Sequence, residues 1–134
     1  MVETRFAPAE RASAADVRGQ HQDLSSIPFL EKVLDSVPDI LVFLNEHRQV
    51  VFANKAVFSF LGVEPTPDLL GTRPGEAFGC VHAVETEGGC GTTEICQTCG
   101  AVQAILAAQH GHPEVKECRI AIKDSGDALD LKVS

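Results

Sequence analysis

The sequence predicts an α+β fold, and three patterns support this class. Apolar residues recur at helical spacing in several separate segments. Two short apolar runs flank a polar stretch, as in a β-hairpin, and the last segments of the chain alternate apolar with polar residues, as strands do. With 134 residues, of which 44% are hydrophobic, the chain has room for one domain with a core of its own.

The charge of the chain restricts its partners. A formal net charge of −8 argues against binding to nucleic acid or to an anionic membrane surface. The longest apolar run, residues 40–44, is too short for membrane insertion, and the first residues lack the basic and apolar segments of a secretory signal. We therefore expect a cytoplasmic protein, in which five cysteines favour metal binding or redox chemistry over structural disulfides.

The N-terminal third of the chain divides into an arm and a helix. Residues 1–23 show little apolar periodicity, which predicts a solvated or loosely helical arm that contributes little to the core. A helix is expected after Ser25, with Pro38 ending it. Its apolar stripe consists of Leu30, Val33, Leu34 and Val37.

A hairpin and a second helix come next. Residues 40–44 and 50–53 are the two apolar runs of the expected hairpin. Asn54 is a good N-cap for the helix that follows, and Gly62 is placed to end it. Two short helical turns are expected over residues 66–70 and 73–78, each with a proline in its first turn.

The last half of the chain contains a loop, a longer helix and two strands. A cysteine-rich loop over residues 79–97 leads into a helix over residues 98–109. Residues 118–122 and 129–133 alternate as strands, and the turn at 124–127 predicts a hairpin between them.

This element order resembles that of the PAS sensory domain, and three segments carry the resemblance: residues 34–45, 51–56 and 60–62. It implies a domain over residues 29–134, preceded by an N-terminal arm and the start of a flanking helix over residues 1–28. It also implies an antiparallel sheet with short helices and one longer helix over one face. The last strand of the family's sheet has no counterpart, so the domain is expected to be C-terminally incomplete.

Residues 75–83, 89–91 and 96–105 also resemble a cysteine-bearing variety of PAS domain from bacterial sensor proteins. The resemblance implies a non-catalytic module that perceives a redox or small-molecule signal and relays it to an output domain outside the chain, such as a histidine kinase. PAS domains commonly pair through N-terminal helices, so a homodimer is a further expectation.

The cysteine loop is the candidate site. Cys80, Cys90, Cys96 and Cys99 supply the four soft ligands of a zinc ion or an iron–sulfur cluster, and His82 is an alternative ligand. Cys96 and Cys99 form a Cys-x-x-Cys pair, but the wider spacings match no standard zinc finger.

Two other interpretations of the thiols stay open. Cys96 and Cys99 lie near a helix N-terminus, where the helix dipole favours a reactive thiolate, so they could form a regulatory disulfide or serve a thiol-disulfide redox enzyme. Alternatively all four thiols are inert, and the chain is a plain dimerisation module. Cys118, beside Ile120 on the apolar face of a strand, is expected to pack in the core.

Overall fold

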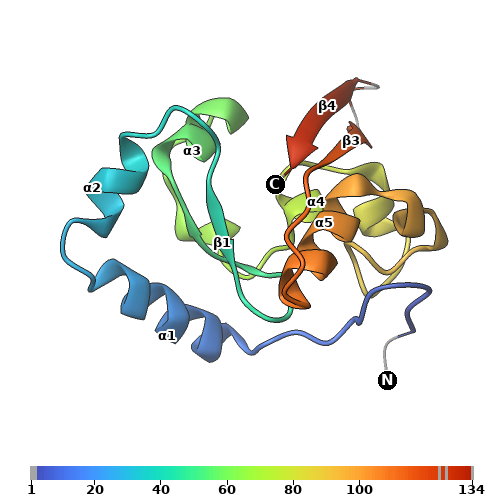
Figure 1. Ribbon diagram of the computed structural model, residues 1–134, viewed down its shortest axis with the longest axis horizontal. Coiled ribbons are helices and arrows are strands. Elements are labelled where there is room, and N and C mark those ends of the chain that lie inside the picture. Colours follow the sequence, from blue (N-terminus) through green and yellow to red (C-terminus); the bar gives the residue numbers. More distant parts are fainter. Residues whose placement is uncertain (1–2, 124, 126, 134) are drawn as a thin grey trace. The chain divides into compact units, whose positions relative to one another are not determined.

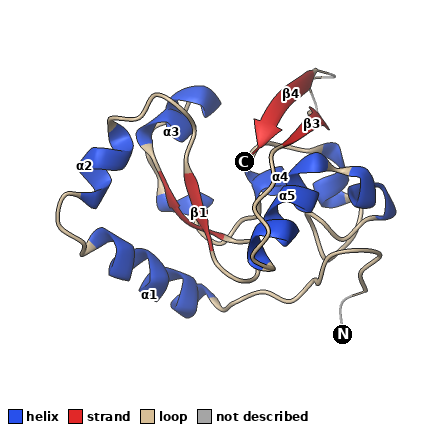
Figure 2. Ribbon diagram, in the orientation of Figure 1, coloured by secondary structure: helices blue, strands red, loops and turns tan. Residues whose placement is uncertain are grey.

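The computed structural model describes residues 3–123, 125 and 127–133, which form two compact units. We call residues 11–72 the pocket unit, and the described residues of 1–10 and 73–134 the cysteine unit. Figures 1 and 2 show the helices and hairpins of each unit. The α+β class is confirmed.

The pocket unit begins with two helices, α1 (Ala14–Ser25) and α2 (Leu30–Asp35). The first of them is a regular helix where a solvated or loosely helical arm was predicted: the Ser13 hydroxyl accepts a hydrogen bond from the Asp16 N–H and caps it. Val17 of α1 is buried, so this segment does contribute to a core. The helix expected after Ser25 is much shorter than predicted, and Val33 on its apolar stripe is 58% exposed.

The predicted hairpin is confirmed as β1 (Val42–Leu44) and β2 (Val50–Ala53), which pair antiparallel. Helix α3 (Lys55–Leu61) follows, and Gly62 ends it at φ 71°, a left-handed conformation that glycine adopts without strain. The first of the predicted turns is a 3-10 helix, η1 (Pro67–Leu69).

Asn54 precedes α3 as predicted, but its side chain does not cap that helix. Its Oδ1 accepts a hydrogen bond from the Leu41 N–H at 3.0 Å. Its Nδ2 donates to the carbonyls of Leu34 and Asp39, at 3.0 and 2.9 Å. The fully buried Asn54 therefore joins the end of α2, the start of the hairpin and the start of α3.

The cysteine unit contains the remaining elements. They are α4 (Pro74–Ala77), the 3-10 helices η2 (Val81–Val84) and η3 (Glu94–Thr98), α5 (Gly100–Gln109), β3 (Lys116–Ala121) and β4 (Ala128–Val133). The short turn, the long helix and both closing strands match the prediction. The predicted turn at 124–127 lies in part outside the described residues.

Strands of the described residues pair only within their hairpins, as one two-stranded sheet of β1 and β2 and another of β3 and β4 (Figure 2). In β3, Cys118 and Ile120 point to the same buried face, as the alternating pattern predicts. No helix in the described part of the chain combines the length and the apolar character needed to cross a membrane.

Candidate functional site

Cys80 and Cys90 both lie against Gly75 at the start of α4. A Cβ atom at Gly75 would be 2.8 Å from the Cys90 sulfur and 3.3 Å from the Cβ of Cys80. The Gly75 N–H donates to the Cys90 sulfur at 3.3 Å, and the Cys80 N–H donates to the Gly75 carbonyl at 2.7 Å. Only glycine leaves room for both cysteines at this position.

The Cys80 thiol lies at the start of η2. Burial raises its pKa above the ordinary value, and the nearby backbone N–H groups of His82 and Ala83 oppose this rise. Negative charge on Cys99 or Cys96 would raise the pKa of Cys80 further. These thiols are therefore close enough to influence one another electrostatically.

Cys96 is the most deeply buried of the predicted ligands, with 5% of its surface exposed. It packs in a small cluster with Ala7 and Val102, and its sulfur lies 2.9 Å from the Thr93 hydroxyl. The Cys96 thiol is thus enclosed by apolar groups and one hydroxyl.

Cys99 is half-buried and precedes the first residue of α5. Its side chain lies near enough to the thiol of Cys118 on β3 to influence the pKa of that thiol. Burial raises the pKa of Cys118, and negative charge on Cys99 raises it further, while the Ala101 N–H at the start of α5 lowers it. Cys99 therefore has a thiol partner in Cys118 besides its sequence neighbour Cys96.

The donor chemistry of the loop suits a soft metal or an iron–sulfur cluster. Within residues 3–123, 125 and 127–133, however, no three His, Cys, Asp or Glu side chains are grouped so that they could hold a metal ion. His82, the alternative ligand, has its Nδ1 2.6 Å from the Glu85 carboxylate in a partly exposed pair. In this arrangement the predicted ligands do not form one coordination site.

A buried arginine holds the loop, and the sequence analysis did not single it out. Arg73 is 0% exposed, and its guanidinium donates to the carbonyls of Gly88 at 3.0 Å and Glu10 at 2.8 Å. The Glu76 carboxylate accepts from the Arg73 N–H at 3.1 Å and from the Cys90 N–H at 3.0 Å. Arg73 and Glu76 therefore fix the position of Cys90.

The N-terminal segment over residues 5–10 lies along this loop. The N–H groups of Arg5 and Ala7 donate to the carbonyls of Thr92 and Gly91, at 2.8 and 2.9 Å. The Gln97 side chain donates to the Arg5 carbonyl at 3.1 Å. We call residues 5–10 the strap; the chain continues from the strap into α1.

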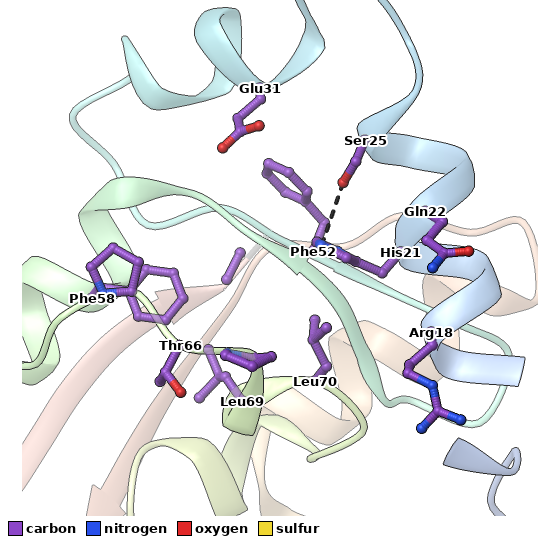
Figure 3. Close-up of a pocket in the computed structure, with 13 residues that line it drawn as sticks. Arg18, His21, Gln22, Ser25, Glu31, Phe52, Phe58, Thr66, Leu69 and Leu70 are labelled. Atoms are coloured by element: carbon purple, nitrogen blue, oxygen red, sulfur yellow. Dashed lines mark hydrogen bonds between the residues drawn. The ribbon is translucent and has the colours of Figure 1, made fainter. Parts of the chain in front are cut away.

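The pocket unit has a pocket of about 430 Å³ (Figure 3). Phe52 of β2, with Leu69 and Leu70, supplies apolar lining, and Phe52 stacks on His21 of α1 at a centroid distance of 6.2 Å. Arg18 from α1 and Glu31 from α2 add charged groups to the lining. A volume of this size is typical of small-molecule sites.

A sequence model of the PAS domain family matches residues 29–95, half of the chain. The chain belongs to the PAS domain family. PAS domains are sensory and signalling modules that are usually non-catalytic. Searches of curated proteins and of solved structures found no match.

The match places the hairpin, Asn54, Gly75 and two of the predicted ligands, Cys80 and Cys90, within the PAS domain. It ends before Cys96, so the contact between Cys99 and Cys118 lies beyond it. Sequence spacing could not reveal that contact, since it depends on how α5 packs against β3. The sequence offered one indication of it: Cys118 is a fifth cysteine, left over once the other four are assigned to the candidate site.

Proposed function

We propose that this PAS domain perceives a redox signal at the thiols of the cysteine unit and relays it to an output domain outside the chain, such as a histidine kinase. The observation that supports this proposal is the mutual proximity of the thiols: Cys80 interacts electrostatically with Cys96 and Cys99, and Cys118 with Cys99 and Cys80. A reducing compartment such as the cytoplasm would keep them free until an oxidant arrives.

Two structural connections would carry the signal away from the thiols. Cys99 immediately precedes α5, so a change at its sulfur acts on the first turn of that helix. Arg73 and the strap connect the loop around Cys90 to the chain that enters α1. Oxidation that rearranges the loop would therefore be transmitted to both helices.

The alternative of a thiol-disulfide enzyme is less well supported. Such an enzyme would use Cys96 and Cys99 together, so both thiols of the pair must be accessible. Cys96 is buried and in contact with the Thr93 hydroxyl, and the Cys99 thiol has Cys118 as a second partner. We therefore assign the thiols to sensing.

Reversible oxidation of the purified chain tests the proposal. We expect a peroxide to remove free thiols, dithiothreitol to restore them, and amide hydrogen exchange in residues 5–10 and 100–109 to differ between the two forms. A variant with all five cysteines replaced by serine should show no difference. Failure of the unmutated chain to oxidise reversibly would refute redox sensing.

Metal analysis of anaerobically purified protein separates thiol oxidation from a metal centre. Our proposal expects substoichiometric iron, zinc and sulfide, and alkylation of all five thiols. Stoichiometric zinc, or iron with sulfide, would favour the metal centre, with Cys80, Cys90, Cys96 and Cys99 as the soft donors to test by substitution.

A small-molecule signal is the second candidate, and the pocket between α1, β2 and η1 favours it. Native mass spectrometry of the intact chain as purified would detect a retained ligand. Leu70→Trp should abolish the retained mass by filling the pocket. Val63→Trp, at a half-exposed position outside the lining, is the matched control.

Homodimerisation through the N-terminal helices is also part of the proposal. Phe29 and Val33, at the start of α2 and within it, are 74% and 58% exposed. Burying them against a second copy of the chain would remove apolar surface from water. Light scattering should detect a dimer that Val33→Asp weakens, and a monomer at all concentrations in the unmutated chain would contradict it.

A further inference from the structure

Helix α5 begins in direct contact with the backbone of β3. A Cβ atom at Gly100 would lie 2.0 Å from the Glu117 carbonyl oxygen and 2.8 Å from its carbon. No other residue fits at this distance without moving one of the two elements. Because Gly100 and Glu117 meet, their neighbours Cys99 and Cys118 are brought together as well.

The two thiols influence one another across this junction. The Cys99 side chain raises the pKa of the Cys118 thiol, and the Ala101 backbone at the start of α5 lowers it. Because Gly100 and Glu117 are in direct contact, a local rearrangement at the start of α5 could bring the two flanking sulfurs to the bond length of a disulfide, about 2.05 Å.

Access to oxidant differs between the two. Cys99 is half-buried, whereas Cys118 is 8% exposed on the inner face of β3. An oxidant from solvent therefore reaches Cys99 first, and Cys118 is the nearby thiol that can react with the oxidised sulfur. The thiol of Cys96 lies 2.9 Å from the Thr93 hydroxyl, in a cluster with Val102 against which Cys99 also packs, so Cys96 is the competing partner that the test must distinguish.

We propose that Cys99 and Cys118 form a reversible disulfide that covalently joins the N-terminus of α5 to β3. This inference rests on the proposed redox function and names the pair that carries it. It also gives a sensing role to Cys118, for which the sequence predicted only core packing.

The oxidation requires a peroxide as co-reactant. The Cys99 sulfur attacks one peroxide oxygen, the O–O bond breaks, and Cys99 becomes a sulfenic acid while water is released. The Cys118 sulfur then attacks the Cys99 sulfur, the S–O bond breaks, and a second water leaves. Two thiols and one hydrogen peroxide thus give one disulfide and two waters, and an external dithiol reverses the reaction.

Disulfide mapping in the unmutated chain is the direct test. After hydrogen peroxide treatment, remaining thiols are alkylated and the chain is digested with trypsin, which can cleave after Lys55, Lys116 and Arg119 but not after Arg73, because Pro74 follows it. We expect residues 117–119 linked to residues 56–116, and the linkage lost after dithiothreitol. We also expect a higher thermal midpoint for the oxidised chain, because the cross-link constrains the unfolded state.

Single substitutions identify the partner within residues 56–116. Cys99→Ser should abolish the link to residues 117–119, while Cys96→Ser, the matched control, should retain it. Cys118→Ala should leave Cys99 trapped as a sulfenic acid that dimedone labels. A different linked pair, with Cys118 still alkylated, would overturn this inference and leave redox sensing intact. Absence of any reversible oxidation would refute the proposed function itself.

Discussion

The pocket unit and the cysteine unit differ in the side chains that they bury. In the pocket unit the buried residues include a run of apolar side chains on β2, Val50, Val51 and Phe52, with three polar side chains, Arg48, Gln49 and Asn54. In the cysteine unit they include a charged guanidinium, two threonines and two thiols, Arg73, Thr92, Thr93, Cys96 and Cys118, beside small apolar side chains such as Val102 and Ala104. Both units bury apolar area and polar groups, and the cysteine unit differs in its buried thiols and in the close contacts at Gly75 and Gly100.

The presence of buried thiols among hydrogen-bonded polar groups makes the cysteine unit the more suitable place for a redox sensor site. Polar and thiol groups held by hydrogen bonds have few alternative positions, so a chemical change at one sulfur must displace its neighbours. The loop around Cys90 is held in this way by Arg73 and Glu76. An apolar interior transmits a change at one atom less specifically, but it can enclose a ligand.

The largest loss of stability is expected from Arg73→Met, which removes a buried hydrogen-bond donor from the cysteine unit. It leaves the carbonyls of Gly88, Cys90 and Glu10 without their buried donor. We expect a loss of roughly 3 kcal/mol or more in the free energy of unfolding, measured by urea denaturation. Hydrogen exchange should rise in residues 5–10 and 88–97 before it rises in the hairpin of the pocket unit.

Arg119→Met is the control for that change. Arg119 is exposed on β3, 3.5 Å from the Asp130 carboxylate, so its loss should cost less than about 0.5 kcal/mol. Equal effects of the two substitutions would contradict the assigned role of Arg73.

Asn54→Ala is the corresponding change in the pocket unit. It removes the side-chain Oδ1 acceptor and the Nδ2 donor of a fully buried residue whose hydrogen bonds connect the end of α2 to the start of the hairpin. We expect a loss of about 2–3 kcal/mol by urea denaturation. Asn54→Asp keeps an acceptor for the Leu41 N–H but cannot donate to the Leu34 and Asp39 carbonyls, so it should not restore stability.

Gly100→Ala tests the junction between α5 and β3. The added methyl group would collide with the Glu117 carbonyl, so we expect a loss of about 1–3 kcal/mol in thermal or urea denaturation. Disulfide formation between Cys99 and Cys118 should slow as well, because the two elements must separate. Unchanged stability would show that this contact is not as close as the structure places it.

The smallest effect, and one of opposite sign, is expected from Gly19→Ala in α1 of the pocket unit. No atom lies within 4 Å of the position of the new methyl group. Alanine in a helix interior should therefore stabilise the chain by about 0.5–1 kcal/mol, measured in the same denaturation series. A destabilising result would indicate that α1 is packed differently.

The elements that the sequence predicted correctly are those in which a local pattern and its end signals coincide. The hairpin of residues 42–53, α3 with its Gly62 terminator and the alternation of Cys118 and Ile120 all follow from side-chain periodicity. Helix α1 was predicted only as a solvated or loosely helical arm because its surface is mostly polar and only Val17 is buried, so the apolar period is absent.

For the candidate site, the sequence by itself determined which thiols are present and which two elements carry Cys99 and Cys118. Their contact was decided only by the tertiary structure, because it depends on the approach of Gly100 to the Glu117 backbone. The role of Arg73 was decided in the same way, since its acceptors are backbone carbonyls distant in sequence and every residue type has one. Periodicity reports which side chains are buried, but hydrogen bonds and close glycine contacts arise only once the chain is folded.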